Sequence, residues 1–433
     1  MGGFFFMGMT VQTLHKYFLK SSGVCTDTRA IQPNCIFFAL KGDRFDGNEF
    51  ALQALTEGAS YAVIDNDKYQ VNDKTILVAD VLQSLQELAR YHRQQFDIPI
   101  IGLTGSNGKT TTKELIKSVL SQRYHTLATV GNLNNHIGVP LTLLKLDAAV
   151  EIAVVEMGAN HPGEIKMLSE IALPNFGYIT NFGKAHLEGF GSLDGVIKAK
   201  TELYRFLQHT NGKIFANGYN ATQMKLSEHT KRIVFGPAHS DYPVSLVNDR
   251  GSLVVQYKQT EMQSNLTGVY NFENIAAAIA IGAYFQLNEE AIKKGIESYV
   301  PSNHRSQIIT LGSNVIFMDA YNANPTSMKA ALENFIRVEG AQKIVFLGDM
   351  FELGRDSASE HQQIVDFLSN NFEGEAYLIG ENFYNTTVAS PHIHKFKSYS
   401  ETIPAVKTHK PENAEILIKG SRGMALERLL DVL

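Results

Sequence analysis

The sequence predicts an α/β protein of three domains, with a central P-loop-type domain on a parallel sheet and a C-terminal dinucleotide-binding-like domain. Three observations predict this fold. The chain has 433 residues, and a domain typically contains roughly 100–200 residues. Short apolar runs alternate with amphipathic stretches, which is typical of layered α/β folds. One apolar run leads directly into a glycine-rich loop with a lysine, and a helical stretch follows it.

The composition is that of an ordinary globular protein. Hydrophobic residues make up 44% of the chain and charged residues 19%, so each domain can bury an apolar core. The formal net charge is -5, which disfavours a nucleic-acid-binding surface, and we expect no nucleic-acid partner. The two cysteines, Cys25 and Cys35, lack Cys-x-x-Cys spacing. We therefore expect reduced structural thiols and a cytoplasmic protein.

The first residues contain a short apolar run at positions 4–7. A secretory signal has positive charge before an apolar core of roughly 7–15 residues, whereas the first lysine, Lys16, follows this run. We interpret the segment as a leader ahead of Met9 that results from an upstream start codon. No apolar stretch approaches the roughly 20 residues that a membrane span requires, so we expect no span.

The first domain is predicted to cover residues 1–97. Its last helix begins after Asp80, a residue type that caps helix N-termini, and ends near Arg93. Apolar residues recur along this helix at helical spacing, namely Leu82, Leu85, Leu88 and Ala89. The residues that follow, 96–99, are predicted to form the linker to the next domain.

The second and third domains are predicted to cover residues 98–301 and 302–433. Apolar runs of strand length lie in the second domain at residues 100–103, 152–155 and 178–180. Similar runs lie in the third domain at residues 315–318, 344–347, 377–379 and 416–418. Helical patterns separate these runs, and this alternation is typical of βαβ units on a parallel sheet.

The strongest local signal is the glycine-rich loop between the run at 100–103 and a helical stretch at 114–120. The loop consists of Thr104, Gly105, Ser106, Asn107, Gly108, Lys109, Thr110 and Thr111. In a phosphate loop, glycines let backbone N–H groups approach phosphate oxygens, the lysine reaches the outer phosphates, and the next hydroxyl can bind Mg²⁺. These residues therefore predict a nucleotide-phosphate site.

The match to the common pattern G-x-x-x-x-G-K-[ST] is incomplete, because Leu103 occupies the position of the first glycine. The alternative is a glycine-rich turn that binds nothing. The strand, the Gly-Lys-Thr core and the helix together favour nucleotide binding. The loop by itself does not distinguish a kinase, a GTPase, a motor or a ligase.

Further segments extend this signal along nearly the whole chain. After the loop come an asparagine-rich segment (131–140), a strand-end glutamate (155–159), a histidine segment (181–192) and a lysine segment (199–203). Later segments lie at residues 270–274, 304–306, 319–325, 347–354 and 418–424. Together with residues 26–29 and 42–47, they resemble the Mur ligase family in collinear order. The family has histidine at the position of Tyr270, so we assign Tyr270 no role.

The resemblance implies an ATP-dependent ligase that joins D-alanyl-D-alanine to a UDP-N-acetylmuramoyl tripeptide through an acyl phosphate. It implies that the first domain binds the UDP-muramoyl substrate, the second ATP, and the third ATP and D-alanyl-D-alanine; we expect a monomer. Residues 319–325 and 348–354 argue against a folylpolyglutamate synthase or the ligase that adds the third amino acid. Alternatives from other classes are a P-loop kinase, a GTPase and an inactive scaffold.

Four side chains form the predicted catalytic set, namely Lys109, Glu156, His186 and Lys200. Glu156 ends an apolar run, and a carboxylate at the carboxyl end of a strand faces the ligand crevice and suits Mg²⁺. Taken alone, Glu156 also fits a solvated acid, His186 a surface histidine and Lys200 a solvated cation.

The resemblance implies two Mg²⁺ ions held by Thr110, Glu156, His186 and Lys200, with Lys200 converted by CO₂ into a carbamate. That reaction requires a neutral amine, so burial or nearby cations must lower the pKa of Lys200.

The resemblance also assigns binding residues. Besides the loop, the ATP-binding set contains Asn271, Asn274, Arg305 and Asp319. The two asparagines either contact adenine or cap a helix, and Arg305 and Asp319 either reach phosphate and ribose or form structural ion pairs. The substrate-binding set contains Asp27, Thr28, Arg29, Asp46, Gly47, Asn134, Asn135, Tyr321, Asn322 and Asn324.

Overall fold

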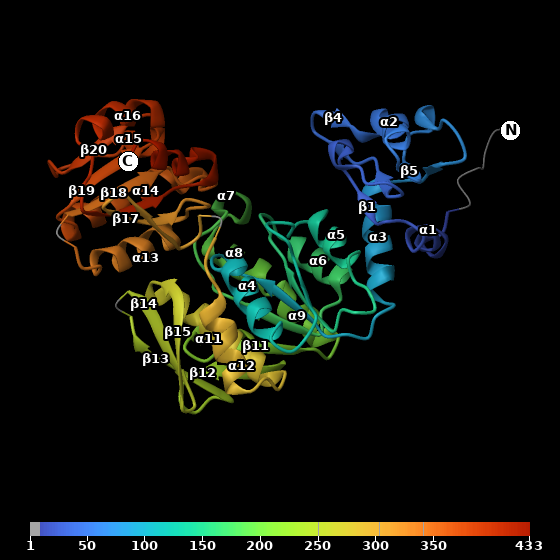
Figure 1. Cartoon of the computed structure of the whole chain (residues 1–433), viewed down its shortest axis with the longest axis horizontal. Coiled ribbons are helices and arrows are strands. Elements are labelled where there is room, and N and C mark those ends of the chain that lie inside the picture. The colour runs from blue at the N-terminus through green and yellow to red at the C-terminus, as the bar shows by residue number, and fades with distance from the viewer. Residues whose placement is uncertain (1–8, 250, 303, 341) are drawn as a thin grey trace.

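The structure is a computed structural model that describes residues 9–249, 251–302, 304–340 and 342–433. The expected leader, residues 4–7, lies outside these described residues. The described strands form three larger sheets and one two-stranded ribbon. Figure 1 shows the N-terminal sheet (blue) and the C-terminal sheet (red) at opposite ends of the molecule, with the central unit between and below them.

The N-terminal sheet has the order β1-β2-β5-β6, and all of its strands are parallel. The strands are Val24–Cys25 (β1), Ile36–Phe38 (β2), Tyr61–Ile64 (β5) and Thr75–Leu77 (β6). A ribbon pairs Lys41–Gly42 (β3) with Phe45–Asp46 (β4) in antiparallel orientation. The helices of this unit are Val11–Phe18 (α1), Ala51–Thr56 (α2) and Val81–Arg93 (α3).

The helix predicted after Asp80 is confirmed as α3. The Asp80 carboxylate accepts a hydrogen bond from the backbone N–H of Gln83, which caps the helix N-terminus. The predicted apolar face is buried at Leu85, Leu88 and Ala89. Helix α3 joins the N-terminal unit to the central one, because it packs against α5 (Gly138–Leu143) and α6 (Glu164–Ala172).

The central sheet has the order β15-β14-β13-β12-β11-β10-β7-β9-β8. Its parallel strands are Ile100–Thr104 (β7), Thr126–Ala128 (β8), Ile152–Glu156 (β9), Phe176–Ile179 (β10), Lys213–Asn217 (β11), Lys231–Gly236 (β12) and Tyr242–Asn248 (β13). Two antiparallel strands, Ser252–Tyr257 (β14) and Thr260–Thr267 (β15), extend the sheet. The apolar runs at 100–103, 152–155 and 178–180 are thus confirmed as strands, within two residues at each end.

Helices cover the central sheet, and its middle strands are buried and apolar. Every residue of β7 and β9 is buried, as expected for parallel strands with helices on both faces. Helix α4 (Lys109–Leu120) packs against α11 (Phe272–Tyr284) and α12 (Glu289–Ser298). The remaining helices are Leu187–Phe190 (α7), Leu193–Lys200 (α8), Glu202–His209 (α9) and Ala221–Leu226 (α10).

The C-terminal sheet has the order β16-β17-β21-β18-β19-β20, and only the β16–β17 pair is antiparallel. The strands are Gln307–Leu311 (β16), Asn314–Asp319 (β17), Gln342–Gly348 (β18), Glu375–Ile379 (β19), Ile393–Phe396 (β20) and Ala414–Lys419 (β21). The helices are Pro325–Ile336 (α13), Ser357–Asn371 (α14), Glu381–Tyr384 (α15) and Tyr399–Thr408 (α16). The predicted α/β fold with central and C-terminal parallel sheets is confirmed.

Cys25 and Cys35 are buried free thiols. Among the described helices, none is both long and apolar enough to cross a membrane.

Candidate active site

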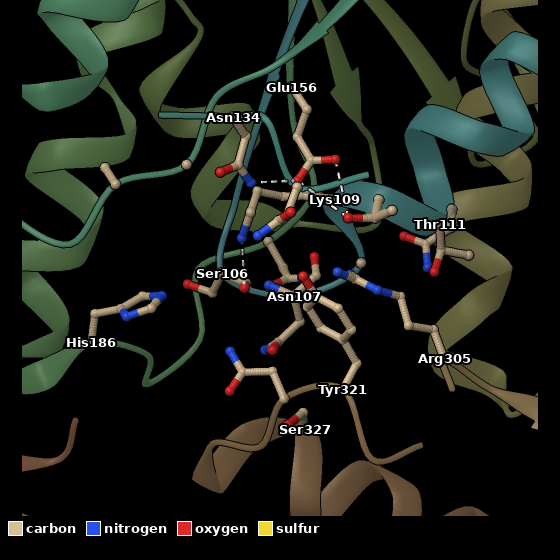
Figure 2. A pocket seen from close by; sticks show the side chains of 18 of the residues that line it. Ser106, Asn107, Lys109, Thr111, Asn134, Glu156, His186, Arg305, Tyr321 and Ser327 are labelled. Carbon is tan, nitrogen blue, oxygen red and sulfur yellow. Dashed lines mark hydrogen bonds between the residues drawn. The ribbon is translucent and has the colours of Figure 1, made fainter. Parts of the chain in front are cut away.

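A cavity of about 670 Å³ lies where the carboxyl ends of β7 and β9 face the C-terminal unit. Open α/β sheets bind ligands at this edge. Figure 2 shows Lys109 and Glu156 reaching it from the central unit, His186 at one side, and Arg305 and Tyr321 at the wall opposite. The predicted residues that line it are Ser106, Asn107, Gly108, Lys109, Thr110, Thr111, Asn134, Asn135, Glu156, His186, Asn271, Asn274, Arg305, Asp319, Tyr321 and Asn322.

Two glycines allow the phosphate loop its path. Gly105 follows Thr104, the last residue of β7, and has a φ of +146°, and any side chain there would collide with the hydroxyl of Thr180. Gly108 has a φ of +77° and caps α4, where a Cβ atom would lie 2.7 Å from the amide oxygen of Asn274. Only glycine accommodates both the backbone and the space. The loop therefore ends at the N-terminus of α4, whose N–H groups favour anions.

Lys109 is the first residue of α4. Its ammonium group donates hydrogen bonds to the backbone oxygens of Gly105 (2.8 Å) and Ser106 (3.1 Å). Burial lowers the pKa of Lys109, the nearby charge of Arg305 lowers it further, and Glu156 opposes both. A partly buried ammonium group whose hydrogen bonds go to neutral carbonyls remains available to an anionic phosphate, which forms stronger, charge-assisted hydrogen bonds.

Glu156 ends β9 and is buried, so the alternative of a solvated strand-end acid is wrong. Its carboxylate accepts hydrogen bonds from the Thr110 hydroxyl (3.0 and 3.2 Å) and the Asn134 amide (2.8 Å). The backbone N–H of Glu156 donates to the Thr129 hydroxyl at 3.0 Å, which fixes the strand end. A hydroxyl, an amide and a carboxylate thus converge beside the phosphate loop.

Sequence reasoning missed Lys113, which belongs to the same group. Its ammonium lies 3.9 Å from Glu156 and 2.8 Å from Glu114, and its side chain is 0% exposed. It also donates to the backbone oxygen of Thr129 at 2.6 Å. The spacing of Lys109 and Lys113 was the available signal, because residues four apart share one face of a helix.

Asn271 and Asn274 are buried residues at the start of α11. Neither caps that helix, since Asn271 occupies the N-cap position without a side-chain capping bond, and its amide group donates instead to the backbone oxygen of Thr267 at 2.7 Å. Instead, the Asn274 amide oxygen accepts from the Thr112 hydroxyl at 2.9 Å, and its amide group donates to Asn271 at 2.9 Å. The helix-cap alternative is therefore wrong, and the pair braces α4 from within the cavity wall.

The wall formed by the C-terminal unit carries cations around one aromatic ring. The Arg305 guanidinium lies 3.5 Å from the centre of the Tyr321 ring, a cation–π contact. Arg305 stands between two residues with left-handed backbone, His304 (φ +55°) and Ser306 (φ +48°), and such strain is characteristic of functional sites. The structural ion-pair alternative applies to Asp319, which pairs with the buried Lys419, while Arg305 forms no ion pair with any described residue.

Polar contacts join the phosphate loop to the C-terminal unit. The Asn324 amide, at the N-cap of α13, donates to the Asn107 side-chain oxygen at 2.6 Å. The Lys184 ammonium lies 2.5 Å from the Glu360 carboxylate. Asn324 thus does not line the cavity but holds the loop that does.

His186 is held from across the same boundary. Its Nδ1 atom pairs with the Glu352 carboxylate of the C-terminal unit. Glu352 has a φ of +62°. Among the described residues, no group of three or more His, Cys, Asp or Glu side chains is arranged to hold a metal ion.

Lys200 ends α8 and is 1% exposed, so the alternative of a solvated cation is wrong. Its ammonium donates to the backbone oxygen of Ala159 at 3.3 Å and lies 5.3 Å from the centre of the Phe190 ring. Burial lowers the pKa of Lys200 well below its usual value, and the charge of Lys109 adds to this effect. Lys200 lies behind the cavity lining, which includes Ala159.

The remaining predicted substrate residues lie in the N-terminal unit and do not line this cavity. Asp27 caps a 3₁₀ turn that begins at Thr28, and its bonds to Arg29 lower the Asp27 pKa to about 2. Asp46 caps a second such turn that begins at Gly47, where a side chain would collide with the backbone of Leu40. These residues therefore form two ordered turns, and none of them lines the cavity beside the phosphate loop.

Comparisons with known proteins agree with this architecture. The Mur ligase family, catalytic domain, matches residues 20–93, the Mur ligase middle domain residues 103–282, and the Mur ligase glutamate ligase domain residues 304–422. The chain is 36% identical to the UDP-N-acetylmuramoyl-tripeptide–D-alanyl-D-alanine ligase of Bacillus subtilis, over 94% of this chain and 92% of that protein.

Solved structures of similar fold also belong to Mur ligases. A crystal structure of MurF from Acinetobacter baumannii aligns with a TM-score of 0.87 and 31% identity over 98% of both chains. The MurF ligase of Thermotoga maritima in complex with ADP aligns with a TM-score of 0.84 and 26% identity, over 96% of this chain and 97% of that one. With matches of this length at every level, the chain belongs to the Mur ligase family.

Proposed function

We propose that the protein is an ATP-dependent ligase that joins D-alanyl-D-alanine to UDP-N-acetylmuramoyl tripeptide, giving UDP-muramoyl pentapeptide, ADP and phosphate. The observation that carries this proposal is the cavity between the central and the C-terminal units. It brings a phosphate-loop lysine, an oxygen cluster and an arginine to one place. The full-length similarity to the Bacillus subtilis ligase supports the choice of substrates. In this proposal the reaction takes place in the cytoplasm, and the enzyme is a monomer.

The chemistry requires activation of a carboxylate. A carboxylate oxygen of the tripeptide attacks the γ-phosphorus of ATP, the bond to the bridging oxygen breaks, and ADP leaves. The amine of D-alanyl-D-alanine then attacks the acyl carbon, loses a proton, and displaces inorganic phosphate. Negative charge accumulates on the phosphoryl group in the first step, where Lys109 and Arg305 can stabilise it.

The oxygen cluster at the end of β9 fits Mg²⁺. Thr110, Glu156 and Asn134 present hydroxyl, carboxylate and amide oxygens within hydrogen-bond reach of one another, and Mg²⁺ prefers such hard oxygen ligands. Thr110 and Glu156 would hold the ion, and it would neutralise charge on the ATP phosphates. His186 would contribute to a second ion through its other ring nitrogen, a role supported by the contact that Glu352 makes with its Nδ1 atom.

We propose further that Lys200 carries a carbamate. The reaction needs a neutral amine, and burial with the nearby charge of Lys109 lowers the pKa of Lys200 in that direction. The amine attacks CO₂ and loses a proton, which converts a buried cation into an anionic oxygen donor. Such a donor would complete the ligand set begun by Glu156 and His186.

The three units take different ligands in this proposal. Residues 1–97 bind the UDP-muramoyl end, with Asp27, Thr28, Arg29, Asp46 and Gly47 at its ordered turns. Residues 98–301 bind ATP, and residues 302–433 complete the ATP site and bind D-alanyl-D-alanine. Because ATP contacts two units, closure of the C-terminal unit over bound nucleotide would assemble the site.

Initial rates of phosphate release test the proposal. Purified protein receives ATP and Mg²⁺ with UDP-muramoyl tripeptide, with D-alanyl-D-alanine, with both or with neither, and the product is identified by its mass. We expect phosphate release only when UDP-muramoyl tripeptide and D-alanyl-D-alanine are both present, together with a pentapeptide product. Release without D-alanyl-D-alanine would instead indicate a kinase or GTPase. A further reaction with glutamate and folate in place of these substrates tests for a folylpolyglutamate synthase, and release there would indicate that enzyme.

A further inference from the structure

Two cations of the C-terminal unit contact Tyr321 and a third, Lys419, contacts the next residue, Asn322, and their charges are balanced differently. The Lys419 ammonium pairs with Asp319 and donates to the backbone oxygen of Asn322 at 3.4 Å. Arg305 lines the cavity beside the phosphate loop, where its charge lowers the pKa of Lys109. Arg422 is exposed and forms no ion pair with any described residue. Arg422 does not line the cavity itself, but it contacts the lining residue Tyr321 and has no counter-charge among the described residues.

Tyr321 holds the two arginines at different parts of its ring. Arg305 lies over the ring face, 3.5 Å from its centre. Arg422 donates to the ring hydroxyl at 3.2 Å, and its guanidinium carbon lies 5.1 Å from the ring centre. A guanidinium has five donors in a planar fork, so the single bond to Tyr321 leaves an edge free for an anion.

The backbone beneath Arg422 is fixed. Arg422 follows the carboxyl end of β21, the sheet edge at which such folds bind ligands. The preceding residue, Ser421, donates from its N–H to the backbone oxygen of Asp349 at 3.1 Å, and its hydroxyl accepts from the N–H of Phe351 at 2.9 Å. At Gly423, a Cβ atom would lie 2.9 Å from the Phe351 ring. An anchor on such a turn loses little flexibility on binding.

The loop that supports Arg422 also reaches the histidine side of the cavity. Phe351 is bonded to Ser421, and the next residue, Glu352, pairs with His186 of the central unit. One short segment therefore connects the histidine side of the cavity with the turn that carries Arg422. A zwitterion whose amine reacts needs a separate cation for its carboxylate.

We propose that Arg422 binds the carboxylate of D-alanyl-D-alanine and thereby selects a dipeptide with a free C-terminus. The inference rests on the proposed ligase activity. The dipeptide keeps its carboxylate throughout the reaction, and arginine is the side chain best suited to bind a carboxylate through two parallel hydrogen bonds. The ATP phosphates already have Lys109 and Arg305, so Arg422 is left for a second anionic ligand.

A cycle of two nucleophiles and four proteins tests the inference. The nucleophiles are D-alanyl-D-alanine and its C-terminal amide, which lacks the negative charge. The proteins are the native chain, Arg422→Ala, Arg422→Lys and Arg428→Ala. Arg428 is a matched control, because it also lies over a tyrosine ring, that of Tyr399 at 4.1 Å, and bonds only backbone oxygens among the described residues. KM is measured for each nucleophile, for ATP and for the UDP-muramoyl tripeptide.

We expect Arg422→Ala to raise the KM for D-alanyl-D-alanine by about tenfold or more, the value of a hydrogen bond to a charged group. The KM values for ATP and tripeptide stay within about twofold, as expected when only one ligand's contact is removed. The native enzyme prefers the dipeptide over its amide by a similar factor, and Arg422→Ala loses that preference. Arg428→Ala behaves like the native chain, and Arg422→Lys retains part of the preference.

An unchanged preference for the free carboxylate in Arg422→Ala overturns the inference, as does a native enzyme that uses the amide equally well. The second result needs no variant, so it decides the matter even if Arg422→Ala does not fold. A native protein that releases phosphate without any dipeptide overturns the proposed ligase activity itself. A ligase that depends on the dipeptide but not on Arg422 overturns the inference alone.

Discussion

The central unit meets its two neighbours through chemically different surfaces. Toward the N-terminal unit, helix α3 packs on α5 and α6 and contributes the buried side chains of Leu85 and Leu88. Hydrogen bonds from Gln86, His92 and Arg93 to backbone oxygens of the central unit accompany this packing. Toward the C-terminal unit, the contacts around the cavity are polar, and they include Asn107–Asn324, Lys184–Glu360 and His186–Glu352. We call these the apolar seam and the polar seam.

The difference between the two seams indicates which boundary between units can open. Separating an apolar seam exposes hydrocarbon to water at roughly 25 cal/mol per Å². Water can replace the hydrogen bonds of a polar seam, so each one contributes only about 1 kcal/mol net. ATP must enter and ADP must leave through the cavity at the polar seam. We therefore expect the polar seam to move during turnover and the apolar seam to stay closed.

The largest expected effect is that of Lys109→Ala, which removes a charge at the polar seam. Lys109 bonds only two backbone oxygens, so we expect little change in thermal stability. Loss of a cation aimed at the transferring phosphate should lower kcat by about a hundredfold or more. Steady-state kinetics and a thermal melt of the same preparation check both statements. Near-native turnover in the folded variant would refute the phosphate-loop assignment.

Leu88→Ala tests the apolar seam. Leu88 is fully buried on α3, the helix that packs against the central unit. Truncating such a leucine should cost about 2–5 kcal/mol of unfolding free energy, measured by denaturant unfolding. At a temperature where the variant is folded, we expect its KM for ATP to stay near the native value. A change confined to ATP binding, without loss of stability, would contradict the proposed division between the two seams.

Lys200→Ala tests the carbamate. If the carbamate is a metal ligand, the variant should lose activity by about tenfold to a hundredfold or more, and added acetate should restore part of it by supplying oxygens. Lys198→Ala is the control, because Lys198 is an exposed lysine of the same helix. Equal activity of the two variants, or no response to acetate, would count against the carbamate. So would the absence of a carbamate carbon signal from the native protein in labelled bicarbonate.

The smallest effect concerns two buried histidines at the apolar seam. His15 bonds His92 at 2.9 Å, and His92 bonds the backbone oxygen of Leu146 at 2.8 Å. Burial lowers the pKa of both histidines, so the unfolded chain binds protons more readily than the folded one. Stability should be fully present above pH 6.5, the ordinary histidine pKa, and fall as the pH drops below it.

The slope should reach up to about 1.4 kcal/mol per pH unit for each histidine. Denaturant unfolding of the native chain and His92→Gln between pH 7 and pH 5 isolates this contribution, because other titrating groups are common to both. We expect the variant to show the shallower slope. Parallel curves would show that His92 does not link protonation to the stability of this seam.

The local patterns predicted more of the fold than of the site. Apolar runs such as those of β7, β9 and β21 predict strands because parallel strands buried on both faces need continuous hydrocarbon. The antiparallel extension β14–β15 was not predicted, because its residues alternate between buried and partly exposed positions and lack a long apolar run.

Among the site residues, those defined by local spacing were predictable, and those defined by contacts in the folded chain were not. The phosphate loop was predictable because glycine, lysine and threonine are required at fixed spacing. Lys113 and Glu352 were not predicted, since their roles depend on contacts made in the folded chain with Glu156 and His186. The burial of Lys200 likewise arises from the packing of α8 and not from its own segment.

The central claim is that ATP at the polar seam activates a carboxylate of the UDP-muramoyl tripeptide. The most direct measurement labels that carboxylate with a heavy oxygen isotope and follows the label during turnover with D-alanyl-D-alanine. If the carboxylate attacks the γ-phosphorus, one labelled oxygen must leave in the inorganic phosphate, because the amine displaces it from the acyl phosphate. Mass spectrometry of the phosphate should therefore show one heavy oxygen per turnover. Unlabelled phosphate, with the label retained in the tripeptide, would contradict the account.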